Sequence, residues 1–318
     1  MSRFDHYGVV VLPEDFKGAN WIELCRRHGL RTLGIHSGGG PSVDIVRTLG
    51  HYGTEAFRKE VAAAGLECEY ECHATASFLS PDLFKEHPEY YAFDTRRNRR
   101  RNDSNLCVTN ADAMEIYHRN AETLIRQLYS LSTHRYMLWN VDCPRIYCHC
   151  DKCASLSPSD QAMLATNELA RAARAVDPLA TVPYLGYMEM IEPPTQIAPE
   201  PNVFLEFAPI ERCYRHALND SACATNRRYF QRLKRLLELF PASTAHVLEY
   251  YLDSSFFSGY GLPAVEVRPD RDIMDRDFDL YAELGIRSIT TFAVYLDGAY
   301  FRNHGEAGLA DYAEIVRK

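Results

Sequence analysis

The sequence predicts an α/β fold, a single (β/α)8 TIM barrel that spans residues 1–318, and three observations lead to this prediction. Eight short apolar runs recur along the chain, and each ends in polar or acidic residues. Stretches with helical periodicity separate most of these runs, which is typical of parallel strands joined by crossover helices. The chain of 318 residues is long enough for one barrel of about 250 residues with insertions. The runs are 7–13, 32–37, 66–78, 136–142, 181–188, 203–210, 246–253 and 288–297.

The predicted helices carry recognisable stop signals. Gly29 follows the predicted helix 21–28, and Gly65 follows the predicted helix 54–64. Glycine is common just after a helix because it adopts left-handed backbone conformations without strain. The remaining helices are predicted at 111–131, 159–176, 226–240 and 272–284, before a short C-terminal helix.

Three connections depart from this regular alternation. Residues 80–110, after the third strand, form a long segment without periodicity, and a loop of this length in a compact domain is usually functional. We therefore expect it to form a lid or rim. A cysteine-rich loop follows the fourth strand. The fifth strand is followed by Pro193 and Pro194, which disfavour a helix, so the fifth crossover is expected to be degenerate.

Composition restricts the class of partner. The net charge of −8 and the pI near 5.9 argue against a nucleic-acid partner, which favours a basic surface. No apolar run approaches the ~18 residues of a membrane helix. The N-terminus has no apolar signal-peptide region, so we expect a cytoplasmic protein without a membrane partner, unless a leader was removed. The basic stretch 96–101 is interpreted as a solvated loop tip, or alternatively as a contact for an acidic sugar.

Acidic residues recur at or just after the ends of predicted strands, namely Asp142, Glu211, Glu249 and Asp297. In a barrel these strand ends meet at one mouth, where the active site lies. Two carboxylates across a pocket suit glycosidic bond cleavage, because one protonates the leaving oxygen and the other attacks the sugar or activates water. Each acid alone could instead cap a helix or form a salt bridge. We predict Asp142 and Glu249 as the opposing catalytic carboxylates, with Glu211 as the third candidate.

Histidines and aromatic residues occupy similar positions. His36, His73 and His216 follow predicted strands, and with carboxylates they could form a Zn, Mn or Fe centre. Contacts to sugar hydroxyls are the preferred interpretation. Aromatic rings at strand ends can stack on sugars, although barrel interiors also need bulky side chains. The predicted substrate-binding residues are His36, His73, Trp139, Asn140, His216, Tyr251, Asp253, Tyr295 and Asp297.

The most specific local motif contains Cys148, Cys150 and Cys153. Three thiols at this spacing can bind one tetrahedral zinc ion, but a structural zinc site usually has four ligands. Without a secretory signal, free thiols or metal ligands are favoured over disulfides. We therefore expect a candidate structural zinc site and no cofactor for catalysis. The candidates for the fourth ligand are Cys107, Cys143, His149, Cys213 and Cys223.

An ordered series of motifs between about residues 66 and 297 resembles a bacterial family of unknown function with glycoside-hydrolase-like barrels. This family is distantly similar to hexosaminidase and α-glucuronidase barrels. The resemblance implies that Asp142, Glu211, His216 and Glu249 line the pocket. Relatives often have Asp at position 249, and accessory domains usually flank their barrel. The motifs are 84–92, 105–110, 140–142 with 147–153, 211–218 with Cys223 and Asn226, and 248–250.

The sequence thus predicts a cytoplasmic glycoside hydrolase that cleaves a small oligosaccharide or glycoside. Two alternatives stay open at this point. One is a metal-dependent sugar isomerase or hydrolase on the same barrel, and the other is a barrel that binds sugar without catalysis. The oligomeric state, the sugar and the stereochemistry do not follow from the sequence.

Overall fold

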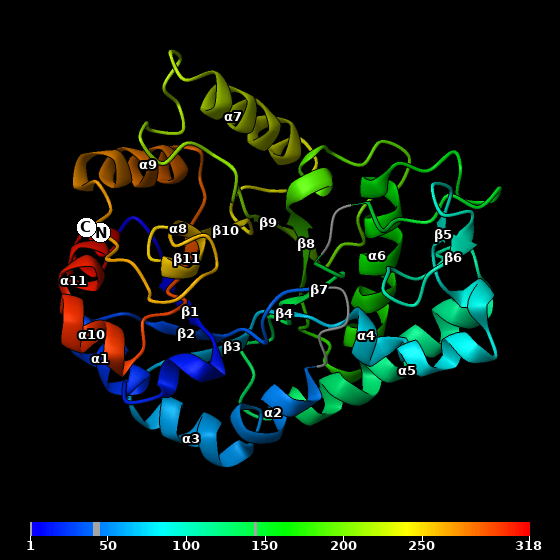
Figure 1. Cartoon of the computed structure of the whole chain (residues 1–318), viewed down its shortest axis with the longest axis horizontal. Helices are drawn as coiled ribbons and strands as arrows, with labels where there is room; N and C mark the ends of the chain where they lie inside the picture. Colours follow the sequence, from blue (N-terminus) through cyan, green and yellow to red (C-terminus); the bar gives the residue numbers. More distant parts are fainter. Residues whose placement is uncertain (1, 41–44, 143–144) are drawn as a thin grey trace. The chain divides into compact units, whose positions relative to one another are not determined.

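The computed structural model describes residues 2–40, 45–142 and 145–318, and the chain divides into two compact units. Unit one comprises residues 1–36, 58–69 and 205–318. Unit two comprises residues 37–57 and 70–204. Figure 1 shows the course of the chain through these segments. Each predicted apolar run overlaps at least one strand.

Unit one is built on parallel strands. β1 pairs in parallel with both β2 and β11, so the first and last strands of the chain are neighbours. β10 pairs in parallel with β11 and with β9. The side chains of Val9, Val10 and Val11 have no solvent exposure, as expected for strands buried on both faces. The order of the strands is β3 (Glu67–Tyr70), β2 (Thr32–Ile35), β1 (His6–Val11), β11 (Ser288–Phe292), β10 (His246–Glu249) and β9 (Val203–Phe207).

Helices follow the strands of unit one, and α9 packs against α11 (Figure 1). The predicted stop signal of α1 is confirmed: Gly29 has φ 68°, and the Asn20 side chain caps the other end by accepting a hydrogen bond from Glu23 N. The elements are η1 (Pro13–Phe16), α1 (Trp21–His28), α3 (Glu55–Ala63, which begins in unit two), α7 (Ala224–Leu237), α8 (Ser254–Phe257), α9 (Arg271–Glu283), α10 (Gly298–His304) and α11 (Ala307–Val316).

Unit two has shorter strands and two long helices. β4 pairs in parallel with β7, and an isolated parallel bridge joins Arg135, before β7, to Thr181, before β8. α5 and α6 lie side by side (Figure 1). The elements are α2 (Val46–Tyr52), β4 (Cys72–His73), α4 (Thr75–Phe78), η2 (Pro81–Lys85), η3 (Pro88–Tyr90), β5 (Phe93–Asp94), β6 (Arg99–Arg100), α5 (Ala111–Leu128), β7 (Leu138–Trp139), α6 (Pro158–Val176), β8 (Val182–Gly186) and η4 (Met188–Ile191).

The structure corrects three details of the prediction. The run 66–78 is not one strand, because it divides into β3, β4 and α4. The segment 80–110 is not irregular: it holds two 3₁₀ turns and the antiparallel hairpin β5–β6, whose carboxylate Asp94 accepts hydrogen bonds from the backbone of Arg96 and Arg97. α2 was not predicted. Between β8 and β9 the described chain contains η4 and no α-helix, in agreement with the expected degenerate crossover.

Among the residues that the structure describes, no helix combines the length and apolar character needed to cross a membrane.

Candidate functional site

Four predicted site residues of unit two come together at the carboxyl ends of β4 and β7, namely His73, Trp139, Asn140 and Asp142. The Nδ1 atom of His73 donates a hydrogen bond of 2.5 Å to the Asn140 carbonyl oxygen. Its ring meets Trp139 edge-on, with centroids 5.1 Å apart. Burial lowers the pKa of His73, while the nearby Asp142 carboxylate acts to raise it. His73 is therefore held with the proton on Nδ1, and Trp139, only 3% exposed, supports its ring.

The carboxylate of Asp142 has one oxygen atom without a hydrogen-bond partner in the described part of the chain. Its Oδ1 atom is shielded from solvent and has no hydrogen-bond partner among the described residues. A buried acceptor without a partner costs about 1–3 kcal/mol unless a ligand or water satisfies it. The backbone of Gly39 lies against the other oxygen, because a Cβ atom at position 39 would stand 2.2 Å from Oδ2. Asp142 is thus placed to interact with a bound molecule.

Asn105 supports this strand end, and the sequence analysis did not identify it. Its Oδ1 atom accepts a hydrogen bond of 3.1 Å from Val141 N, and its own backbone N donates to Ile146 O at 3.2 Å. Asn105 therefore fixes the backbone on both sides of Asp142. It lies within the motif 105–110, but no spacing in the sequence indicated this role.

Glu189 is a second acidic residue of unit two, and it lies in η4 shortly after β8. It follows β8, and its Oε2 atom accepts a hydrogen bond of 3.2 Å from Arg145 N. The bridge between Arg135 and Thr181 makes the segments that lead to Asp142 and Glu189 parallel neighbours. Strand ends on parallel neighbours lie at the same edge. The other acids were selected because they lie at or just after the ends of predicted strands. The same criterion could have selected Glu189, since it directly follows the predicted strand 181–188.

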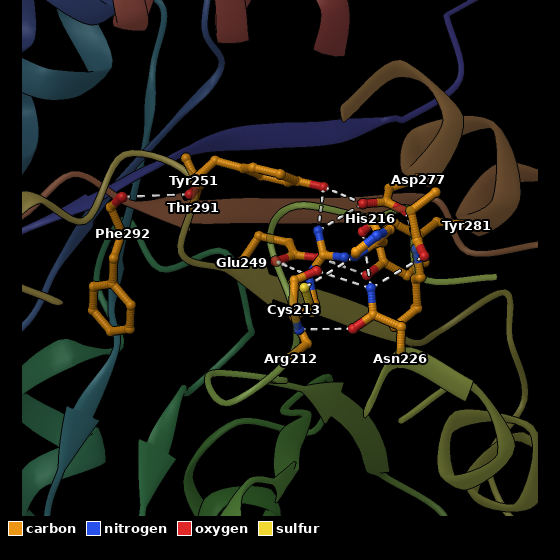
Figure 2. Close-up of polar contacts among 12 residues, drawn as sticks. Arg212, Cys213, His216, Asn226, Glu249, Tyr251, Asp277, Tyr281, Thr291 and Phe292 are labelled. Carbon is orange, nitrogen blue, oxygen red and sulfur yellow. Dashed lines mark hydrogen bonds and ion pairs between the residues drawn. The ribbon is translucent and has the colours of Figure 1, made fainter. Parts of the chain in front are cut away.

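In unit one, Glu249 is part of a buried ion network (Figure 2). The Nε atom of Arg212 lies 3.3 Å from Glu249 Oε2, and the Tyr281 hydroxyl donates to Glu249 Oε1 at 2.6 Å. Arg212 also donates to Asp277 Oδ2 at 2.6 Å and to the Tyr251 hydroxyl at 2.5 Å. The side chains of Arg212, Glu249 and Asp277 have no solvent exposure. Burial raises the pKa of Glu249, and Arg212 acts against this shift.

The expectation that Glu249 lines an open pocket is not met, and strand geometry explains the difference. Successive side chains of a strand point to opposite faces, so the face of Glu249 is opposite to that of Tyr250. Tyr250 packs on the Phe292 ring, with centroids 5.2 Å apart, whereas Glu249 contacts Tyr281 of α9. Glu249 thus faces the helices. Tyr251, predicted to bind substrate, donates its hydroxyl proton to Asp277 at 2.5 Å instead.

The loop that contains Arg212 is held by Asn226 of α7 (Figure 2). The Asn226 side chain accepts a hydrogen bond of 2.7 Å from Cys213 N and donates to the Cys213 and His216 carbonyl oxygens, each at 2.8 Å. His216 itself is exposed, and its Nδ1 atom lies 3.3 Å from Cys213 Sγ. The potential metal-ligand atoms of Cys213, His216 and Cys223 all lie within 4.8 Å of one another. His216 is therefore grouped with two thiols.

Two predicted binding residues cap helices. Asp253 Oδ1 accepts a hydrogen bond from Phe256 N at 3.1 Å at the start of α8. Burial raises the pKa of Asp253. Asp297 Oδ1 accepts from Tyr300 N at 2.8 Å at the start of α10. For both residues the capping role satisfies backbone N–H groups that have no partner within the helix.

Three further predicted site residues of unit one, Glu211, His36 and Tyr295, each lie in a different environment. Glu211 is exposed, and the Tyr229 hydroxyl lies 3.5 Å from its Oε2 atom. His36 is 7% exposed and packs on the Phe292 ring at 5.1 Å. Tyr295 lines a cavity of about 620 Å³ together with Asp297.

Asp15, which the sequence analysis did not select, also lines this cavity. Its two oxygens accept hydrogen bonds from Leu12 N at 2.8 Å and Tyr295 N at 2.9 Å. Burial raises the pKa of Asp15 to about 7. The acid is therefore largely protonated below neutral pH, in contrast to an ordinary aspartate with a pKa of about 3.9.

This shift predicts a pH-dependent stability. Between about pH 4 and pH 7 the folded state keeps the Asp15 proton that the unfolded state loses, so the free energy of unfolding falls as pH rises through this window. We expect Asp15→Asn to flatten this decline, even if its absolute stability is lower. Urea unfolding at several pH values measures the slope. An unchanged slope in Asp15→Asn would refute the assignment, and exposed Asp112→Asn should keep the wild-type slope.

Comparison with known proteins places this chain in a family. The model of the domain of unknown function DUF4838 matches residues 46–311. The chain belongs to the DUF4838 family. A search of curated proteins gave no match. The resemblance noted in the sequence is thereby confirmed at the level of the family.

Solved structures similar to this DUF4838 chain include glycoside hydrolases. A β-N-acetylhexosaminidase from Bacteroides fragilis has a TM-score of 0.59 at 10% identity, and the match covers 99% of this chain but only 66% of that chain. Endo-glycoceramidase II from Rhodococcus sp. has a TM-score of 0.54 at 11% identity, and the match covers 91% of this chain and 73% of that chain. The cellulose synthase subunit CcsZ from Clostridioides difficile has a TM-score of 0.54 at 8% identity, and the match covers 98% of this chain and 99% of that chain. At these identities the similarity establishes a shared α/β fold.

Proposed function

We propose that the protein is a glycoside hydrolase on a (β/α)8 barrel that cleaves a small oligosaccharide or glycoside. The observation that carries this proposal is the buried, unpartnered Oδ1 atom of Asp142 beyond the end of β7. Polar groups at the carboxyl ends of parallel strands form the active sites of barrel enzymes. The structural neighbours include a β-N-acetylhexosaminidase and an endo-glycoceramidase, which supports a carbohydrate substrate.

In the proposed mechanism Asp142 acts as the general acid and donates a proton to the glycosidic oxygen as the bond breaks. We propose Glu189 as the second carboxylate of unit two, which attacks the anomeric carbon or activates the water that attacks it. It takes the place of Glu249, to which we assign a structural role. His73 would accept a hydrogen bond at Nε2 from a sugar hydroxyl, because its proton lies on Nδ1, which donates to Asn140 O. The proposed reaction needs no cofactor.

A panel of aryl glycosides that includes N-acetyl-hexosamine and uronic-acid substrates tests this function. We expect the wild type to release aglycone from at least one of them. We expect Asp142→Asn to lower kcat by about 10²–10⁴-fold, which is the usual contribution of general acid catalysis. Asp112→Asn is the matched control, since it changes an exposed carboxylate at the start of α5 in the same unit. Equal turnover by wild type and Asp142→Asn would refute the role of Asp142.

The same panel separates the two alternative functions. Activity that is lost with EDTA and restored by a divalent ion, while the Tm stays unchanged, would favour a metal-dependent isomerase or hydrolase, for which Cys213, His216 and Cys223 offer ligands. Tight binding of sugars without turnover by the wild type would favour a binding protein. Either result would overturn the proposed acid chemistry at Asp142.

A further inference from the structure

We propose that Cys107, Cys148, Cys150 and Cys153 bind one structural zinc ion in unit two. Their four Sγ atoms all lie within 4.8 Å of one another. Cys107 comes from the segment between β6 and α5, and the other three come from the loop after β7. Two segments that are about 40 residues apart in the sequence thus supply four thiols, which is one of the ligand sets that structural zinc sites use.

The sulfur positions fit a tetrahedral metal. Cys107 Sγ lies 3.7 Å from Cys150 Sγ and 3.9 Å from Cys153 Sγ. With Zn–S bonds of about 2.3 Å, the edge of a tetrahedron of sulfur atoms is about 3.8 Å. A disulfide would need about 2.05 Å, and all four cysteines are free. Cys107 Sγ therefore lies at the spacing of metal ligands from two of the other sulfur atoms, and all four fall within 4.8 Å.

The surroundings also suit bound thiolates. Four thiolates on Zn²⁺ carry a net charge of −2, which nearby N–H groups and cations stabilise. Phe93 N donates to Cys148 Sγ at 3.4 Å, and the guanidinium of Arg100 donates to the same sulfur at 3.5 Å. Cys153 N donates to the Cys150 carbonyl oxygen at 2.8 Å, which closes the tight turn between these two ligands. Arg100, from the basic stretch 96–101, thus points toward the sulfur cluster.

This geometry selects the fourth ligand among the candidates that the sequence left open. Cys107 completes the site. Cys213 and Cys223 belong to unit one, where they are grouped with His216. His149 is exposed, and Cys143 lies outside the described residues.

The zinc ion would join the hairpin segment to the loop after β7. Asn105, two residues before Cys107, holds the backbone of Val141. The Gln161 side chain forms two hydrogen bonds with the backbone of Cys148, of 2.8 and 2.9 Å. The metal would therefore stabilise the backbone next to Asp142. This inference rests on the sulfur geometry alone and does not depend on the proposed hydrolase activity.

Metal analysis of the full chain, purified with a phosphine reductant and without chelators, tests the proposal. We expect tightly bound zinc in the wild type, and the loss of one zinc equivalent per chain in Cys107→Ser and in Cys153→Ser. Cys25→Ser, which changes a buried thiol of α1, should keep the wild-type content. Cys223→Ser should also retain the zinc equivalent, because Cys223 belongs to the separate cluster with Cys213 and His216.

A second measurement covers the case in which the cysteine variants fail to fold. Titration of the wild type with a mercurial thiol reagent should release zinc in step with the reaction of four thiols, and removal of the metal should lower the Tm. Absence of bound metal in the wild type, iron in place of zinc, or a disulfide at Cys107 under non-reducing conditions would each overturn the proposal. So would an unchanged zinc content in Cys107→Ser.

Discussion

Arg212→Met is expected to destabilise the protein by about 3–5 kcal/mol. The substitution leaves the carboxylates of Glu249 and Asp277 buried without the guanidinium that lies between them. Removing one partner of a buried ion pair is costly because the other charge stays desolvated and uncompensated. The hydrogen bonds from Tyr281 to Glu249 and from Leu218 N to Asp277 remain, so the fold should survive in a weakened form. Urea unfolding of wild type and variant measures the difference.

Two further variants serve as controls for Arg212→Met. Arg26→Met breaks an exposed pair with Glu23, and it should change stability by no more than about 1 kcal/mol. Arg212→Met combined with Glu249→Gln and Asp277→Asn removes the unpaired charges, so it should recover part of the lost stability. If Arg212→Met lowers the free energy of unfolding no more than Arg26→Met does, the buried ion network does not stabilise the fold.

Gly39→Ala is expected to lower kcat by about 10²-fold with little change in Tm. A Cβ atom at this position would stand 2.2 Å from Asp142 Oδ2, so the carboxylate must move. A displacement of about 1 Å at a reacting group can cost 10²-fold in rate. The carboxylate is the end of a flexible side chain, which explains why the fold should tolerate the change. The measurement is kcat on the aryl glycoside that the wild type cleaves fastest, beside the thermal unfolding curve.

Gly50→Ala provides the matched control within unit two. A Cβ atom there meets nothing within 4 Å, and the position lies inside α2, where Ala is favoured over Gly. Its kcat should equal that of the wild type. If Gly39→Ala retains full activity, the position of the Asp142 carboxylate does not limit the reaction.

The sequence predicted the strands well because burial on both faces of a parallel sheet leaves continuous apolar runs. The helix ends were also predictable, since Gly29 after α1 adopts the left-handed conformation that its position suggested. The split of the run 66–78 was not predictable, because it follows from pairing: β3 pairs with β2 and β4 pairs with β7. Pairing is a long-range property that one local apolar run does not encode.

The candidate site was harder to predict than the fold, and side-chain direction is the reason. Glu249 and Tyr250 are adjacent at a strand end, yet only the register decides which of them faces the helices. Asp253 and Asp297 satisfied the strand-end rule, but short helices begin directly after them and recruit them as caps. The partner of the cysteine loop, Cys107, became identifiable only when the chain brought two distant segments together.

The central claim, that Asp142 acts on a bound sugar, is tested most directly by a crystal structure of Asp142→Asn with the best substrate from the panel. The inactive variant should hold the intact glycoside, with the glycosidic oxygen within about 3.2 Å of the side chain at position 142. A sugar bound elsewhere, with position 142 making no contact to it, would contradict the account.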